Sequence, residues 1–295
     1  MTTGLQEILD LEQLEVHLFR GRSRRAPATR VFGGEVAGQA LVAAGRTVPA
    51  DRRVHSLHAY FLRPGDPGHP ILYQVDPIRD GGSFTTRRVV AIQHGEPVFQ
   101  LSASFQAHED GLSHQLPQLT SPDPESLPSA EESLRSADDR SRAWFARLMD
   151  MFPLELRFPE ELPRIATVRG ERRPPSQRVW LRSAQPLSDD PLVHVCAATY
   201  ASDLFLLAAA LPPHGLVIDD PGLQFASLDH AVWFHAPFRA DDWLFYDQEG
   251  TWTGGSRALC RGSLFDRNGT LVASVVQEGL VRLRSRERPA PHAPR

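Results

Sequence analysis

The chain contains few cysteines and no long apolar run, and both absences narrow its class. Cys196 and Cys260 are the only cysteines among 295 residues, and no second pair stands near them. The cysteines therefore suggest neither a disulfide framework nor a zinc site built from cysteine pairs, and we expect two reduced core thiols in a cytoplasmic protein. No basic N-terminal region precedes an apolar run, and no segment approaches the roughly 18 apolar residues that cross a bilayer. We expect no membrane span.

Charge of one sign is nowhere concentrated. The 32 basic and 36 acidic residues are dispersed along the chain, without the basic face that binds nucleic acid, so nucleic acid is not expected as a partner. Gly33, Gly34 and Gly38 do not fit the dinucleotide-binding fingerprint, because no strand-turn-helix unit with a later acidic partner follows them. At this length we expect two domains of ordinary size.

The first half of the chain combines helical and strand patterns. Apolar spacing predicts a short helix at 5–14, a strand at 15–19, and a helix at 36–47 whose small residues suit close wrapping by a sheet. Short turns then separate four predicted strands, at 54–61, 71–76, 84–93 and 98–105. Such connections favour antiparallel pairing. One helix enclosed by a meandering antiparallel sheet is typical of a hotdog domain.

The second half repeats this order of elements. Gly81-Gly82-Ser83 before one hairpin matches Gly254-Gly255-Ser256, and the turn His94-Gly95 matches Asn268-Gly269. The corresponding elements are a strand at 178–182, a helix at 201–210, and strands at 227–234, 243–246, 257–265 and 271–282. We therefore predict an α+β fold, a tandem double hotdog in which each antiparallel sheet wraps around a central helix.

Four regions follow from this repeat. The first hotdog domain is expected at 1–110, and a proline-rich linker with one helix, at 131–149, is expected at 111–165. The second hotdog domain is expected at 166–286, before a flexible tail at 287–295.

Three polar residues stand out in the second half. The stretch Phe225–Phe238 has the pattern of a strand with one buried face, and it places Ser227 among apolar neighbours. Asp203 directly precedes an apolar run, and Gln277 follows two valines in the last strand. The residues alone leave other interpretations open, because Ser202 or Asp203 fits equally well as a helix N-cap. A lone glutamine in a strand also faces solvent more often than it takes part in catalysis.

Long motifs resemble the acyl-CoA thioesterase II family, from about residue 10 to residue 283. They are Val31-Phe32-Gly33-Gly34-Glu35-Val36-Ala37-Gly38-Gln39-Ala40, Val54-His55-Ser56-Leu57-His58-Ala59-Tyr60-Phe61-Leu62-Arg63-Pro64-Gly65, Ala201-Ser202-Asp203, Ser227-Leu228-Asp229-His230-Ala231-Val232-Trp233-Phe234-His235 and Ala273-Ser274-Val275-Val276-Gln277-Glu278-Gly279. The resemblance implies a double-hotdog fold, hydrolysis of acyl-CoA to a free fatty acid and CoA, and no cofactor or metal. It places the catalytic set on Asp203, Ser227 and Gln277, with Ser227 where many members have threonine.

The chemistry of these groups fits that implication. A carboxylate, a hydroxyl and an amide can hold one water, with Asp203 as general base and Ser227 and Gln277 as aligners. The N–H groups of the helix expected at 201–210 could then face the thioester carbonyl. Direct attack by Asp203 stays open. A serine nucleophile with His230 or His235 as its base is disfavoured, because the Gly-x-Ser-x-Gly elbow is absent.

Substrate-binding candidates are less distinctive. Arginines are expected to hold the CoA phosphates and apolar residues to line the acyl tunnel, although the same residues serve equally as solvated surface and ordinary core. The candidates are Arg63, Arg87, Arg88, Arg282, Leu204, Phe205, Trp233 and Phe234. Two other functions stay open, a protein that binds acyl-CoA without hydrolysing it and an acyl-thioester hydratase. Because hotdog domains generally pair through their sheets, we also expect a homo-oligomer.

Overall fold

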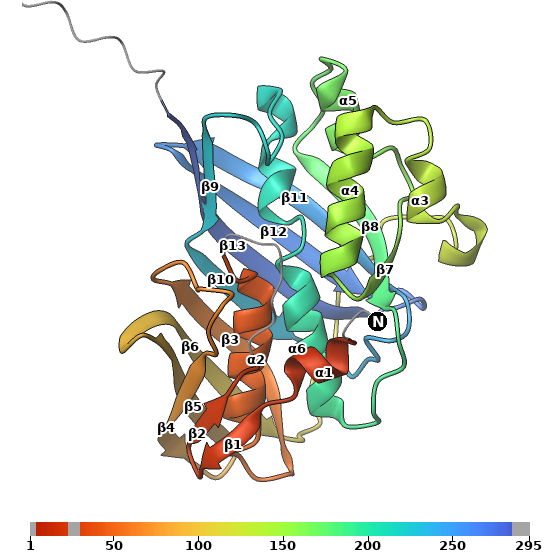
Figure 1. Cartoon of the computed structure of the whole chain (residues 1–295). Coiled ribbons are helices and arrows are strands. Elements are labelled where there is room, and N and C mark those ends of the chain that lie inside the picture. The colour runs from red at the N-terminus through yellow and green to blue at the C-terminus, as the bar shows by residue number, and fades with distance from the viewer. Residues whose placement is uncertain (1–3, 23–29, 285–295) are drawn as a thin grey trace, which may run out of the picture.

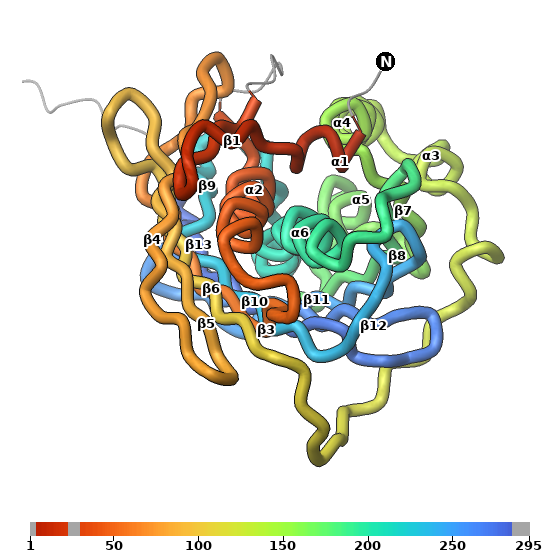
Figure 2. The backbone as a smooth tube through the Cα atoms, turned by 90° about the horizontal axis from the view of Figure 1, so that it is seen from below, coloured from red at the N-terminus to blue at the C-terminus, as the bar shows by residue number. Residues whose placement is uncertain are grey.

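One antiparallel sheet runs through both halves of the molecule and curves around two central helices (Figures 1 and 2). The computed structural model describes residues 4–22 and 30–284, and the tail expected at 287–295 lies outside them. Within the described residues the sheet has thirteen strands, and twelve of them follow the order β1-β2-β4-β5-β6-β3-β10-β13-β12-β11-β8-β7. The two halves meet where β3 pairs with β10. This arrangement is the predicted α+β double hotdog.

The first half supplies six strands of the sheet. They are β1 (Glu12–Glu15), β2 (Leu18–Arg20), β3 (Arg52–Phe61), β4 (Leu72–Asp80), β5 (Phe84–Gln93) and β6 (Glu96–Ala107). The four strands predicted at 54–105 are confirmed, whereas the strand predicted at 15–19 is a short hairpin of β1 and β2. The helix predicted at 5–14 is only α1 (Leu5–Leu9), because Glu12 already belongs to β1.

The second half mirrors this arrangement. Its strands are β7 (Leu154–Arg157), β8 (Ser176–Ser183), β9 (Leu223–Ser227), β10 (Asp229–Phe234), β11 (Leu244–Gly254), β12 (Arg257–Phe265) and β13 (Leu271–Leu283). Both matched turns fall at corresponding hairpins, between β4 and β5 and between β11 and β12 for the Gly-Gly-Ser pair. The strand predicted at 227–234 is interrupted at Leu228, and its two parts, β9 and β10, both pair with β13.

The segment between the halves is partly built into the second sheet. It contains η1 (Pro124–Ser126), α3 (Ala130–Ser133), α4 (Asp139–Met151) and α5 (Pro163–Val168). One predicted helix at 131–149 is thus two, and α4 buries Phe145 and Leu148 in the core. Strand β7 pairs with β8, so the sheet of the second half begins inside the region expected to be linker. The domain boundaries themselves stay a prediction.

The two central helices lie antiparallel against each other. They are α2 (Gly33–Gly45) and α6 (Pro191–Ser202), and Figure 2 shows them side by side within the curve of the sheet. Their approach depends on small residues, since a Cβ on Gly34 would lie 2.2 Å from the carbonyl oxygen of Tyr200. Because α2 is enclosed by both the sheet and α6, nearly every residue in it is buried.

The helix predicted at 201–210 was wrong in position, because the helix of the second half is α6, at Pro191–Ser202. Asp190 caps α6 by accepting from Leu192 N, Pro191 takes the first helical position, and the helix ends at Ser202. The apolar run that follows forms the short 3₁₀ segments η2 (Leu207–Ala210) and η3 (Pro212–His214). The helix was not predicted at 191–202 because most of α6 is buried and it has no polar face to give it a helical period.

The apolar stretch around α6 is longer than the sequence analysis allowed. Residues Pro191–His214 are long and apolar enough for a membrane span by composition, yet 72% of the most apolar window is buried inside the protein. A core helix of a folded domain has the same properties.

Candidate active site

Asp203, Ser227 and Gln277 come together in one hydrogen-bonded cluster, although they lie on three different elements. Gln277 Nε2 in β13 donates to Asp203 Oδ1 at 2.6 Å and to Ser227 Oγ at 2.8 Å. Ser227 Oγ, at the end of β9, lies 3.3 Å from Asp203 Oδ1 and donates to it. Gln277 is fully buried, and the other two side chains are partly accessible. The three groups therefore surround one carboxylate that solvent can still reach.

The other carboxylate oxygen of Asp203 faces the start of α2 in the first half. Gly34 N donates to Asp203 Oδ2 at 2.9 Å, and α2 has no side-chain cap of its own at Phe32. Asp203 thus caps a helix that is remote in sequence, and its charge lies at the positive end of that helix.

This geometry corrects one sequence inference. Asp203 is the C-cap of α6 and not the first residue of a helix, so the N–H groups of its own helix point away from the cluster. The helix N-terminus at this site belongs to α2. The relevant sequence signal was the glycine pair Gly33-Gly34, because a Cβ on Gly33 would lie 2.7 Å from Asp203 Oδ2.

Buried donors from β11 hold the chain on both sides of Asp203. Tyr246 donates its hydroxyl to the carbonyl of Ser202 at 2.7 Å, and Gln248 Nε2 donates to the carbonyl of Leu204 at 2.8 Å. Both donors are fully buried. The last turn of a helix leaves carbonyls without partners inside the helix, so these two bonds satisfy the end of α6 and orient the carboxylate between them.

The histidines near the site are bonded elsewhere. His230 Nε2 lies 2.8 Å from Ser202 Oγ, and His235 Nε2 lies 2.9 Å from Ser274 Oγ. Neither bonds to Ser227, so the disfavoured serine-histidine nucleophile has no support in the described residues. Burial lowers the pKa of His230 below its ordinary value, which keeps the imidazole neutral at physiological pH.

Only some of the predicted acyl-binding residues lie where they could line a tunnel. Leu204, Phe205 and Phe234 belong to the buried core beside the helices. Trp233 points to the opposite face of β10, where its ring lies 5.1 Å from that of His58. Trp233 is therefore on the outer face of the sheet, away from the cluster, because successive strand residues alternate between faces.

A small cavity of about 30 Å³ lies beyond η2, where α4 and α5 cover the second sheet. Phe205 and Trp144 both line it, and their ring centroids are 6.1 Å apart. Phe205 has a φ of 66°, a left-handed backbone that is unusual for an aromatic residue. Phe205, the residue with this strained backbone, therefore lies two positions after Asp203 in the chain.

Three of the predicted phosphate-binding arginines are engaged in other contacts. Arg87 is 3% exposed, and it donates to Thr47 and Asp80, so its guanidinium is not accessible to a phosphate. Arg88 and Arg63 are exposed and pair with acidic neighbours. Another exposed arginine, Arg30, was not among the predicted residues, and its Nη2 donates to Phe225 O at 2.8 Å. It lies close to Ser227 in space but 197 positions before it in the chain, so no local pattern marked it.

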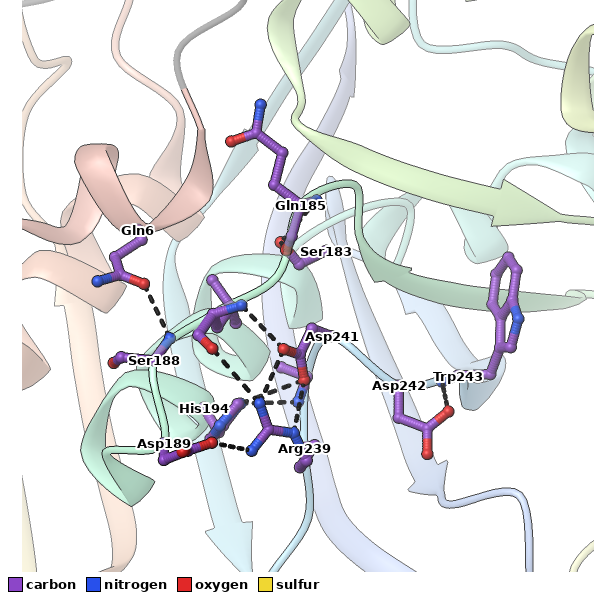
Figure 3. Close-up of polar contacts among 12 residues, drawn as sticks. Gln6, Ser183, Gln185, Ser188, Asp189, His194, Arg239, Asp241, Asp242 and Trp243 are labelled. Atoms are coloured by element: carbon purple, nitrogen blue, oxygen red, sulfur yellow. Dashed lines mark hydrogen bonds and ion pairs between the residues drawn. The ribbon is translucent and has the colours of Figure 1, made fainter.

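The opposite end of α6 is closed by polar contacts (Figure 3). Arg239 donates to Asp189 at 2.7 Å and to Asp241 at 3.0 Å, while Asp241 accepts from Leu187 N. Together with the cap at Asp190, these contacts hold the segment that leads into α6, whereas His194 Nε2 in its first turn is buried without a hydrogen-bond partner among the described residues. Only the end that carries Asp203 presents a reactive cluster.

The fold defines a class, the hotdog thioesterases. A solved acyl-CoA thioesterase II, TesB2 from Mycobacterium marinum, superposes with a TM-score of 0.77 at 45% identity, covering 95% of this chain and 99% of that one. A hotdog-fold protein of unknown function from Alicyclobacillus acidocaldarius is 18% identical with a TM-score of 0.73, covering 94% and 97%. The second likeness supports the fold alone.

Family models identify the particular group. Residues 148–280 match the acyl-CoA thioesterase model, and residues 22–106 match the acyl-CoA thioesterase N-terminal domain. Acyl-coenzyme A thioesterase 8 of Homo sapiens is 42% identical over 94% of this chain and 88% of its own, and acyl-CoA thioesterase 2 of Haemophilus influenzae is 34% identical over 95% and 97%. The chain belongs to the acyl-CoA thioesterase family and is a thioester hydrolase.

Proposed function

We propose that Asp203, Ser227 and Gln277 hydrolyse acyl-CoA by activating one water molecule. The observation that carries this proposal is their convergence, from α6, β9 and β13, on a single partly accessible carboxylate. Hydrolysis needs an oriented water, a proton acceptor and stabilisation of the charge that develops on the thioester oxygen. The cluster and the adjoining helix end provide a group for each need.

Asp203 is the general base in this mechanism. Gln277 and Ser227 both donate to Oδ1, which fixes the orientation of the carboxylate. Gln277 Oε1 is buried and has no partner among the described residues, so it is an acceptor for one hydrogen of the water. Asp203 takes the other proton as the water oxygen attacks the thioester carbon, and then gives this proton to the sulfur as the carbon–sulfur bond breaks and CoA leaves as a thiol.

The first turn of α2 supplies the electrostatic part. Gly34 N already points at the site, and the helix dipole places partial positive charge there. We infer that the thioester oxygen lies against this turn beside Gly33, which is partly exposed, because Gly34 is buried against Tyr200 and its N–H is bonded to Asp203. Helix N-termini bind anions for the same reason.

Isotope labelling separates this route from direct attack by Asp203. In the water route, turnover in ¹⁸O-water labels only the fatty acid. In the other route an anhydride forms on Asp203, and water attacking the aspartyl carbon leaves ¹⁸O in the side chain. Mass spectrometry of the peptide that contains Asp203 after many turnovers should therefore find no label, and label at this residue would contradict the water route.

The substrate extends from the cluster in two directions in this proposal. We infer that the acyl chain runs along Leu204 and Phe205, and that exposed Arg30 and Arg63 hold the CoA phosphates. Arg30→Ala should raise KM for acyl-CoA with little change in kcat. Phe205→Ala should move the preferred chain length, which a panel of acyl-CoA esters of increasing length measures by thiol release.

The reaction type is tested with the purified wild-type chain. We expect stoichiometric release of CoA thiol and free fatty acid from saturated acyl-CoA. Binding without thiol release would favour a non-hydrolytic acyl-CoA binding protein. Loss of enoyl absorbance from an unsaturated ester, without thiol release, would favour a hydratase.

We also infer that copies of the chain associate through the outer face of the sheet near β3 and β10. His58, Tyr60 and Trp233 form a partly exposed aromatic patch there. Light scattering after size-exclusion chromatography should give a mass above the 32.8 kDa of one chain, and Tyr60→Glu should lower it. The cytoplasmic location stays a prediction that cell fractionation would test.

A further inference from the structure

Two loops of the first half bring together a carboxylate and two imidazoles, far from Asp203 in the chain. Asp66 and His69 lie in the loop between β3 and β4, and His94 lies in the turn between β5 and β6. His69 Nδ1 is 2.7 Å from Asp66 Oδ2, and His94 Nε2 is 3.3 Å from the same oxygen. The two rings lie edge to face with centroids 4.6 Å apart.

A buried glutamine fixes the loop that carries two of these groups. Gln93 is 5% exposed, accepts from Asp66 N at 2.8 Å, and donates to the carbonyls of Asp66 and His69 at 3.0 and 2.8 Å. Asp66 Oδ1 is occupied by Gly68 N, at 2.8 Å. The loop is therefore held at both ends by the residue before His94, and only Oδ2 is directed toward the imidazoles.

The backbone at His94 also aims its side chain at the loop. His94 has a φ of 51° and Gly95 a φ of 79°, so the turn uses two left-handed residues, as tight hairpins between strands commonly do. The left-handed backbone conformation is less favourable for histidine than for glycine or asparagine. The turn places Nε2 of His94 on the same oxygen that His69 contacts.

We propose that Asp66, His69 and His94 form a binding site for a divalent transition-metal ion of the zinc class. The three ligand atoms lie within 4.8 Å of one another, and the side chains are exposed enough to close on an ion. Tetrahedral zinc with ligands at about 2.0–2.2 Å needs ligand atoms roughly 3.3 Å apart. Imidazole nitrogens with one carboxylate favour Zn²⁺, Co²⁺, Ni²⁺ or Cu²⁺ over Mg²⁺ and Ca²⁺. Water would complete the coordination.

The ion would join two loops, one of which is hydrogen-bonded to the segment that precedes α2. Gly65 O accepts from Val31 N at 2.9 Å, and Val31 precedes the Gly33-Gly34 pair that meets Asp203. Binding is independent of the hydrolysis proposed above, and its role is to stiffen the loop that supports the start of α2. The failure of either proposal leaves the other intact.

Metal titration of the whole chain tests the site directly. The chain is first dialysed against a chelator, and Co²⁺ is then added while the visible absorption of low-symmetry Co²⁺ is followed, with Zn²⁺ binding measured by calorimetry. We expect one ion per chain, and saturating Zn²⁺ should raise Tm by about 2–4 °C. H94N, which suits the left-handed backbone, and H69Q should each weaken Zn²⁺ binding at least tenfold, and Q93L should weaken it by about 10–100-fold with all three ligands intact.

A matched control is available beyond the other end of β6. His108 lies 3.6 Å from Asp110 without a second imidazole in the group, so H108N should bind Zn²⁺ as the wild type does. Equal Zn²⁺ affinity in the wild type and H94N, or no cobalt spectrum in the wild type, would overturn the proposal. Circular dichroism of each variant establishes that it is folded before its affinity is compared.

Discussion

The two central helices end in opposite surroundings. Near the end of α2, the buried guanidinium of Arg87 donates to the carbonyl of Thr47 at 2.9 Å. At the end of α6, the neutral donors Tyr246 and Gln248 take the corresponding role. A cation is favourable at a helix C-terminus, yet the side chains that donate to these carbonyls at the end of α6 in the described part of the chain are neutral. The second half places the carboxylate of Asp203 there instead.

The strand residues next to the ends of α2 and α6 also differ between the two halves, one pair containing a cation and the other an amide. Arg87 pairs with Ala103 across β5 and β6, and Cys260 pairs with Gln277 across β12 and β13. Arg87 and Cys260 lie equally far after the two Gly-Gly-Ser turns, and Ala103 and Gln277 lie equally far after the turns at Gly95 and Gly269. The second pair therefore corresponds to the first. One copy of the domain thus uses the position to close a helix with a charge. The other copy uses neutral donors for the carbonyls at the helix end and supplies an amide to the carboxylate of Asp203.

The largest test of this difference is Asp203→Asn. Asparagine can still accept from Gly34 N and cap α2, so the fold should persist, but it cannot take a proton from water. We expect kcat to fall by about 10²–10⁴-fold with little change in Tm. Asp190→Asn, at the start of the other helix, is the matched control and should leave kcat unchanged. An active Asp203→Asn protein would refute the assignment.

Removing the groups that align Asp203 should have a smaller effect. Gln277→Ala deletes both of its donated hydrogen bonds, and we expect kcat to fall by about 10²-fold. Ser227→Ala should cost about tenfold, whereas Ser227→Thr keeps the hydroxyl and should stay active. Steady-state thiol release measures all three, and an unimpaired Gln277→Ala protein would remove the amide from the mechanism.

Arg87→Met tests the other side of the comparison. It removes a buried guanidinium whose bonds go to Thr47, Arg79, Asp80 and Thr86, and we expect a loss of about 1–3 kcal/mol in the free energy of unfolding. KM for acyl-CoA should not change, because Arg87 has almost no accessible surface. A raised KM in the folded variant would return Arg87 to the substrate site.

The smallest expected effect is a pH dependence of stability. Burial lowers the pKa of His55, His194, His230 and His235 below the ordinary 6.5. The unfolded chain therefore binds protons that the folded chain does not, so stability is full above about pH 6.5 and is lost as the pH falls toward the folded pKa values. Urea unfolding at several pH values between 5.5 and 7.5 should show this slope. His230→Gln should reduce the change in the free energy of unfolding with pH. An unchanged pH dependence in that variant would show that His230 does not contribute to it.

Much of the fold was predictable because the strands of the first half and the hairpin turns are local features. Strand β5 was predicted at its observed bounds, and the duplicated Gly-Gly-Ser turns indicated the tandem repeat. Strand β7 was missed because it lies alone at the sheet edge within a proline-rich segment. The start of α6 was missed because apolar residues lie on every side of this helix and give it no polar face that marks a helical period.

The sequence alone determined the residue types of the site, an acid, a hydroxyl and an amide within motifs that resemble acyl-CoA thioesterases. The tertiary structure decided what surrounds them. Gly34 N and Asp203 Oδ2 are hydrogen-bonded across 169 positions of the chain, and Asp66 and His94 meet across two loops. Local periodicity carries no information about such contacts, because they depend on how helices and hairpins pack. The helix that faces the reactive carboxylate could therefore be identified only once α2 and α6 were placed side by side.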